Sequence, residues 1–253
     1  MIDIKNLTAG YDNKIILNNV SCKIENNKTT TIIGPNGSGK STLIKCIAKQ
    51  LKPFSGEVFL DGTNILTIKP KEFAKKIAYL KQSRDASSVT VQTLVSHGRF
   101  PHMGFPRKMT VKDKQIVRDA MQKTGIEKFK DKELCELSGG ECQKVYLAMT
   151  LAQEANTIIL DEPTTYLDIK HQLEVLKIIS QLKQEGKTVI SVLHDINSAL
   201  QISDNVIILN KGEVTFCDSP QALINTNIID DAFDIKTQII EIPNNNILLR
   251  FNL

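Results

Sequence analysis

The residues with the clearest chemistry form a glycine-rich octapeptide, Gly34-Pro35-Asn36-Gly37-Ser38-Gly39-Lys40-Ser41. It matches the G-x-x-x-x-G-K-[ST] phosphate-binding pattern at every constrained position. Glycines let the backbone wrap closely around an anion, while N–H groups of the loop and of the next helix point at phosphate oxygens. We expect Lys40 to reach the β and γ phosphates and the Ser41 hydroxyl to bind Mg²⁺. The octapeptide therefore predicts a nucleotide triphosphate site.

The flanking segments favour this interpretation over a chance glycine turn. Residues 29–33 are β-branched and typical of a buried strand, and residues 42–48, beginning at Thr42, have the apolar spacing of a helix. A strand, a glycine-rich turn and a helix therefore follow one another in the order that a phosphate loop requires.

Two adjacent carboxylates, Asp161 and Glu162, end a second apolar strand that we predict from residue 157 to residue 162. A parallel core strand that finishes beside the phosphate loop would let Asp161 bind Mg²⁺, directly or through water. Glu162 would then lie closer to the γ-phosphate, where it can polarise the attacking water. The alternative is a strand that simply runs into a charged turn.

A second anion site is indicated by Ser138-Gly139-Gly140-Glu141, which precedes a helical segment over residues 142–153. Backbone amides at a helix N-terminus attract anions. The same residues are also suited to an ordinary helix N-cap.

Three further polar residues have weaker signals when each is taken alone. His194 follows a strand predicted over residues 188–193, at the sheet edge where open parallel sheets bind ligands, although a lone histidine is usually structural. Gln82 follows a predicted strand and by spacing is an ordinary polar residue. Tyr11, in a turn predicted over residues 9–13, would either stack on an adenine ring or pack.

The rest of the chain predicts a mixed α/β protein. Antiparallel strands are expected before the octapeptide, and helical segments replace the strand-rich pattern over residues 83–152. Asp168 is a plausible N-cap for a helix whose expected buried stripe is Leu173, Leu176, Ile179 and Leu182. Residues 230–253 alternate only weakly and predict no definite element.

Composition narrows the possible functions. The chain has 253 residues and a net charge of +4, from 32 basic and 28 acidic residues, and it has no Trp. This mixed charge argues against a nucleic-acid partner, and the lysine clusters at 69–76 and 128–132 are expected to be solvated helix faces. Five cysteines without a C-x-x-C pair indicate reduced thiols, and we expect neither a signal peptide nor a membrane span.

Taken in order, the motifs resemble the ATP-binding subunit of an ABC transporter, from about residue 1 to residue 222. The resemblance implies a P-loop NTPase (RecA-like) α/β core with an antiparallel β subdomain and an inserted α-helical subdomain. It implies one ABC ATPase domain with its nucleotide-binding core at 1–82 and 153–222, its helical subdomain at 83–152 and a C-terminal extension at 223–253.

The resemblance also implies roles for the residues that match the family motifs. Nucleotide would be bound by Tyr11, which stacks on adenine, by Gly34 to Ser41 with Thr42, by the signature Ser138, Gly139, Gly140 and Glu141, and by Asp168 of the D-loop. Mg²⁺ would be held by Ser41, Gln82 and Asp161, and catalysis would use Glu162, His194 and Gln82. ATP, Mg²⁺, a second copy in head-to-tail arrangement, integral membrane permease subunits and, indirectly, an extracytoplasmic substrate-binding protein are the implied partners. The implied location is the cytoplasmic face of the membrane.

Three stretches further resemble importers of ferric siderophores, haem or cobalamin, namely residues 97–102, 162–168 and 192–197. In two places the chain departs from the family pattern, with Glu141 where the signature usually has Gln and Cys142 where a basic residue often follows. A carboxylate near phosphates is electrostatically unfavourable for ATP-driven dimerisation. A soluble ABC ATPase that acts in cluster assembly, translation or DNA repair, and a non-hydrolysing scaffold, are the rival hypotheses.

Overall fold

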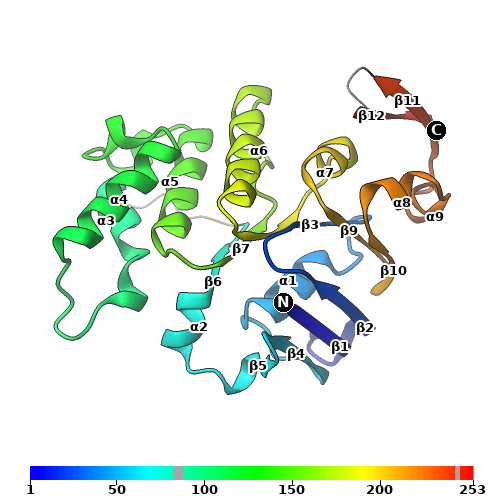
Figure 1. Ribbon diagram of the computed structural model, residues 1–253, viewed down its shortest axis with the longest axis horizontal. Coiled ribbons are helices and arrows are strands. Elements are labelled where there is room, and N and C mark those ends of the chain that lie inside the picture. Colours follow the sequence, from blue (N-terminus) through cyan, green and yellow to red (C-terminus); the bar gives the residue numbers. More distant parts are fainter. Residues whose placement is uncertain (83–87, 243–245, 253) are drawn as a thin grey trace.

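The computed structural model describes residues 1–82, 88–242 and 246–252, and it is built around a six-stranded sheet (Figure 1). Five of its strands are parallel and a sixth, antiparallel strand lies at one edge. In spatial order they are β10 (Glu213–Asp218), β9 (Asn205–Asn210), β3 (Thr29–Ile33), β8 (Thr188–Val192), β7 (Thr157–Asp161) and β6 (Ile77–Leu80).

Three neighbouring interior strands, β3, β8 and β7, are buried along their whole length. Their β-branched sequences fit this position, because a parallel sheet is covered by other elements on both faces. The strands predicted at residues 29–33, 157–162 and 188–193 are thereby confirmed, although the last two end one residue earlier than predicted, and the carboxyl ends of all three meet at one edge of the sheet.

One face of the central sheet is covered by α1 (Lys40–Ile47), which also packs against an antiparallel sheet (Figure 1). That second sheet has the order β2-β1-β4-β5. Its members are β1 (Ile2–Tyr11), β2 (Lys14–Ile24), β4 (Ser55–Leu60) and β5 (Thr63–Asn64). The first two strands are joined by a two-residue turn of Asp12 and Asn13, whose positive φ angles of 46° and 62° suit a tight hairpin. The predicted turn over 9–13 was therefore too long, and Tyr11 is the last residue of β1.

The opposite face of the sheet is covered by α6 (Ile169–Gln184). Asp168 caps this helix as predicted, since its side chain accepts a hydrogen bond from the backbone of His171. The predicted stripe was wrong at Leu173, which is 61% exposed, whereas Val175 and Ile178 are buried. A three-residue step turns a helix by 300°, so a stripe counted in threes drifts off the buried face within three steps.

A group of helices encloses its own apolar cluster beside the central sheet (Figure 1). It contains α3 (Val91–His97), α4 (Val111–Lys123) and α5 (Gly139–Ala152), with 3₁₀ turns at Phe100–His102, Glu127–Phe129 and Leu134–Glu136. Thr110 caps α4, because Thr110 and Asp113 form a reciprocal capping box.

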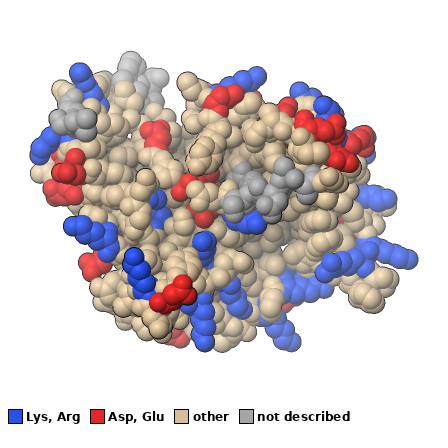
Figure 2. All heavy atoms as spheres, turned by 180° about the vertical axis from the view of Figure 1, so that it is seen from behind, with Lys and Arg blue, Asp and Glu red and all other residues tan. Residues whose placement is uncertain are grey.

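The two lysine clusters differ in structure. The first forms α2 (Pro70–Lys76), which follows a 3₁₀ turn at Ile65–Thr67 and agrees with the predicted helix face. The second, at residues 128–132, overlaps only the 3₁₀ turn Glu127–Phe129 and was wrongly expected to be a regular helix. Figure 2 shows basic side chains along the lower edge and both acidic and basic ones elsewhere, so charges of both signs share this surface.

The C-terminal part packs against the edge of the central sheet that carries β9 and β10. It contains α7 (Ile196–Ile202), α8 (Pro220–Ile224), α9 (Ile228–Phe233) and a hairpin of β11 (Lys236–Ile242) and β12 (Asn246–Asn252). The Asn197 amide ties the hairpin to α7 by hydrogen bonds to the backbone of Leu249, at 2.7 and 3.1 Å. The weak alternation of residues 230–253 therefore conceals two paired strands. Over the described ranges, none of the helices has the length and apolarity that crossing a membrane requires.

Candidate nucleotide site

The glycine-rich loop connects β3 to α1, which is the connection that the sequence predicts. Gly39 has a φ of +104°, a left-handed conformation that residues with a side chain rarely adopt. A Cβ atom at this position would lie 2.6 Å from Leu17 Cδ2, so a larger residue here would have to displace the Leu17 side chain of β2. The backbone N–H groups that follow can therefore face an anion at the start of α1.

Lys40 is the first residue of α1, and its side chain folds back over the loop. The side chain is buried, and its Nζ donates hydrogen bonds to the carbonyl oxygens of Gly34 at 2.8 Å and Pro35 at 2.9 Å. Burial lowers the pKa of Lys40, although the nearby carboxylates of Glu162 and Asp161 oppose this effect. A cation held above a glycine-rich loop is suited to binding phosphate oxygens.

A cavity of about 240 Å³ opens beside this loop and collects several of the predicted residues. It is lined by Tyr11, Ile16, Asn36, Gly37, Gly39, Lys40, Ser41, Thr42 and Glu162. Tyr11 is 42% exposed, and Lys45 Nζ lies 5.6 Å from the centre of its ring and 3.4 Å from its hydroxyl. A half-exposed ring at the mouth of a phosphate cavity can stack on a base.

Asp161 ends β7 and is almost completely buried, with 1% of its surface exposed. Its Oδ1 lies 3.5 Å from Ser41 Oγ, and its Oδ2 accepts a hydrogen bond of 3.1 Å from the Tyr79 hydroxyl. Burial raises the pKa of Asp161, while the Tyr79 hydrogen bond acts in the opposite direction. The phosphate loop and the end of β7 therefore meet at Ser41 and Asp161.

Glu162 is held by side chains that follow the two neighbouring strands and by a third side chain from its own turn. Its Oε1 lies 2.9 Å from Nε2 of His194, which follows β8, and its Oε2 accepts a 2.6 Å hydrogen bond from Gln82, which follows β6. Thr165 Oγ1 donates to the same Oε2 at 3.2 Å. The backbone of Glu162 has a φ of +52°, an uncommon conformation for a residue with a side chain. The structure thus brings together Glu162, His194 and Gln82, the three residues for which the family resemblance implies a catalytic role.

The turn over residues 138–141 caps α5 and lies apart from the phosphate-loop cavity. Among the described residues that line that cavity, none comes from this turn. Ser138 accepts a hydrogen bond from the Glu141 N–H at 3.3 Å, and Glu141 Oε2 accepts from the Ser138 N–H at 2.9 Å. Hydrogen bonds from Ser138 lower the pKa of Glu141. Glu141 therefore forms a capping box, which a Gln would also form.

Asp168 lies beside the same turn through its contact with His171. Asp168 Oδ1 lies 2.8 Å from both the backbone nitrogen and Nδ1 of His171, and the hydrogen bond from the backbone lowers the pKa of Asp168. The His171 ring covers Gly140, where an added Cβ would lie 3.0 Å from the ring. Asp168 and the 138–141 turn are therefore connected within one chain.

Tyr79, Thr165 and His171 were not identified from the sequence. Tyr79 contacts Asp161 on a neighbouring strand, whereas Thr165 and His171 each lie three residues after the predicted site residue that they contact, Glu162 and Asp168. A usable signal exists for Tyr79, because a hydroxyl-bearing aromatic near the end of a core strand and three residues before Gln82 can reach a neighbouring strand end.

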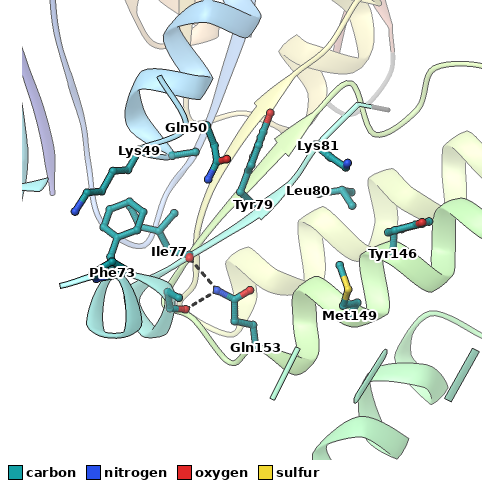
Figure 3. Close-up of a pocket in the computed structure, with 13 residues that line it drawn as sticks. Lys49, Gln50, Phe73, Ile77, Tyr79, Leu80, Lys81, Tyr146, Met149 and Gln153 are labelled. Atoms are coloured by element: carbon teal, nitrogen blue, oxygen red, sulfur yellow. Dashed lines mark hydrogen bonds between the residues drawn. The ribbon is translucent and has the colours of Figure 1, made fainter. Parts of the chain in front are cut away.

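A groove of about 470 Å³ lies between α2 and α5, and Tyr79 is one of the residues that line it (Figure 3). Its walls include Phe73, Ile77, Tyr146 and Met149. Gln153 Nε2 closes one end by donating hydrogen bonds to the carbonyl oxygens of Ala74 and Ile77, the latter at 2.9 Å. The groove is therefore mainly apolar and borders both the central sheet and the helical group.

Comparisons with known proteins agree with this site. Residues 17–165 match the family model described as ABC transporter. The chain is 37% identical to the petrobactin import ATP-binding protein YclP of Bacillus subtilis (strain 168), over 100% of both chains. It is 38% identical to the ferric enterobactin transport ATP-binding protein FepC of Escherichia coli (strain K12), over 94% of this chain and 88% of the relative.

Solved structures agree as well. The dimeric structure of MJ0796, a bacterial ABC transporter cassette, has a TM-score of 0.78 and 31% identity over 87% of this chain and 99% of that chain. The same protein bound to ADP and phosphate has a TM-score of 0.76 and 30% identity over the same shares of both chains. The predicted ABC ATPase fold is confirmed by these likenesses. The chain therefore belongs to the ABC transporter family, as one of its ATP-binding subunits.

Proposed function

We propose that this chain hydrolyses ATP as a head-to-tail dimer and thereby drives uptake of an iron–siderophore, haem or cobalamin-type substrate through a separate membrane permease. The main support is the arrangement at Glu162, whose carboxylate borders the phosphate-loop cavity and contacts both His194 and Gln82. The names of YclP and FepC, which refer to petrobactin and ferric enterobactin, favour iron–siderophore complexes among the three substrate classes.

The proposed reaction is phosphoryl transfer to water, in which positioning and charge neutralisation provide most of the catalysis. Glu162 holds and polarises the attacking water and accepts its proton. Lys40 neutralises charge on the phosphate oxygens, and His194 and Gln82 orient Glu162 from the ends of β8 and β6. Tyr11 stacks on the adenine at the mouth of the cavity.

Ser41, Asp161 and Gln82 are suited to holding Mg²⁺. All three offer oxygen donors, which Mg²⁺ prefers, and Ser41 Oγ and Asp161 Oδ1 lie only 3.5 Å apart. The side-chain nitrogen of Gln82 donates a hydrogen bond to Glu162, so the amide oxygen of Gln82 is left to bind a metal. When it is bound, Mg²⁺ supplies positive charge to the β and γ phosphates.

A second copy of the chain would complete the site. The 138–141 signature turn does not line the cavity of its own chain, so its amides and Ser138 would act on nucleotide bound to the other copy. Tyr166, Ile169 and Leu173, which lie before and after Asp168 in the chain, are 96%, 76% and 61% exposed, and Tyr166 lines a pocket together with Gly139 of this turn. Large apolar side chains that are exposed together mark surfaces suited to association.

The permease is proposed to insert an amphipathic helix into the groove between α2 and α5. An occupant of this groove would contact the nucleotide-binding core, over 1–82 and 153–222, and the helical subdomain, over 83–152, at the same time. Apolar walls and polar ends are typical of grooves that receive such helices. Residues 223–253 form the proposed C-terminal extension.

Affinity purification from native membranes, followed by identification of the co-purifying chains, tests this function. We expect a pair of membrane-spanning proteins, ATP hydrolysis by the complex, and stimulation by the binding protein loaded with a ferric siderophore. Haem and cobalamin serve as the competing substrates. Recovery of only soluble cluster-assembly, ribosomal or DNA-repair proteins would favour the soluble ABC ATPase instead.

A further inference from the structure

Asp161 uses its two carboxylate oxygens in different directions. Oδ1 faces the phosphate loop and lies 3.5 Å from Ser41 Oγ. Oδ2 faces β6 and accepts the 3.1 Å hydrogen bond from the Tyr79 hydroxyl. The orientation of the carboxylate about its Cβ–Cγ bond is therefore set from the side opposite Ser41.

The register of the central sheet explains why Tyr79 can reach this carboxylate. β6 and β7 are parallel, and Tyr79 lies directly opposite Ile159. Asp161 is two residues beyond Ile159, so both side chains point to the face of the sheet that α1 covers. Ile77 and Ile159 belong to the apolar cluster on this face, and the Tyr79 ring packs against it. The hydroxyl therefore spans the diagonal between two neighbouring strands.

The surroundings of Tyr79 keep its hydroxyl in place as a donor. Its ring forms part of the groove wall and stands beside Gln50 in Figure 3, with the hydroxyl pointing away from Gln153. The Tyr79 hydroxyl is the donor in its 3.1 Å hydrogen bond to Asp161 Oδ2. A neutral donor that is fixed by packing can orient a carboxylate without adding charge to the site.

We propose that Tyr79 is a positioning residue, which holds Asp161 Oδ2 so that Oδ1 faces Ser41 and the divalent cation of the bound nucleotide. The inference rests on the proposed function, because it requires Asp161 to act on the cation. Partners of metal-binding carboxylates typically change metal affinity by about 10- to 100-fold when they are removed. Tyr79 contributes to the site through Asp161 and does not touch the nucleotide.

The test compares the full-length protein with Tyr79→Phe, which keeps the ring in the groove wall and removes only the hydroxyl. Affinity for the fluorescent nucleotide TNP-ATP is measured in EDTA and in saturating Mg²⁺, and Mn²⁺ binding to the ADP-loaded protein is measured by EPR. Tyr146→Phe is the matched control, because it removes a hydroxyl from α5 on another wall of the same groove.

We expect Tyr79→Phe to bind TNP-ATP normally in EDTA, but to bind Mn²⁺ about tenfold more weakly and to lose a similar factor from the gain in nucleotide affinity that Mg²⁺ provides. Tyr146→Phe should match the wild type. Unchanged metal binding in Tyr79→Phe would overturn the proposal, and so would an equal loss with and without metal, which indicates damaged packing. A wild-type protein that binds no nucleotide would refute the proposed function itself, and this inference with it.

Discussion

Glu162→Gln is the substitution that tests the site most directly. It keeps the size of the side chain and removes the negative charge from a residue that is only 9% exposed. In the wild type one oxygen lies 2.9 Å from His194 Nε2 and the other accepts from Gln82 at 2.6 Å. The new amide retains one oxygen for these partners, so we expect the surrounding structure to remain while the proton acceptor is lost.

The expected loss of hydrolysis is large because general-base catalysis typically contributes about 10²- to 10⁴-fold, or about 3–5 kcal/mol of activation free energy. Nucleotide binding should be retained or strengthened. Lys40 and the loop are unchanged, and removal of a carboxylate from the cavity reduces repulsion of the phosphates. The variant should therefore bind ATP and fail to turn it over.

The measurements are phosphate release by the purified complex and the nucleotide affinity of the isolated chain. Glu213→Gln is the matched control, because Glu213 is exposed on β10 and accepts a hydrogen bond only from Asn18 among the described residues. Hydrolysis by Glu162→Gln within about threefold of the wild type would refute the assigned role. Parallel loss of binding and hydrolysis would instead indicate a damaged site.

Three further predictions concern stability. Arg99→Ala should lower the free energy of unfolding, measured by denaturant titration, by about 3–5 kcal/mol, since the buried guanidinium lies 2.9 Å from Asp113. The control Arg118→Ala removes an exposed ion pair with Glu127 and should lower it by less than about 1 kcal/mol. Hydrogen bonds, chiefly from the Thr110 hydroxyl, lower the pKa of Asp113 from 3.8 to about 2. Its stabilisation is therefore present above about pH 4 and lost as the pH falls towards 2, so unfolding free energies of Asp113→Asn should vary less with pH over that range than those of the wild type. Gly39→Ala should destabilise the fold by about 1–3 kcal/mol because of its φ and weaken nucleotide binding, and a variant with wild-type stability and affinity would contradict this.

Much of the site follows from contiguous residues. The octapeptide, its strand and its helix are adjacent in the chain, so composition and spacing predict the phosphate loop of β3 and α1. The capping boxes at Thr110 and Ser138 are likewise local, because each joins residues three positions apart. The carboxylates at the end of β7 could be assigned to the same sheet edge, because parallel strands share the direction of their carboxyl ends.

Other features depend on contacts between distant segments. Tyr79 meets Asp161 because the register of β6 on β7 places both on one face, and no local pattern records that register. Leu173 and Ile178 are both apolar, yet only Ile178 faces the sheet, since the angle at which α6 packs selects one side of the helix. The periodicity of apolar residues in the sequence predicts which helices and strands have an apolar side. The packing of sheet, helices and hairpin then determines which side chains meet, because contact energies between distant residues arise only when the elements are assembled.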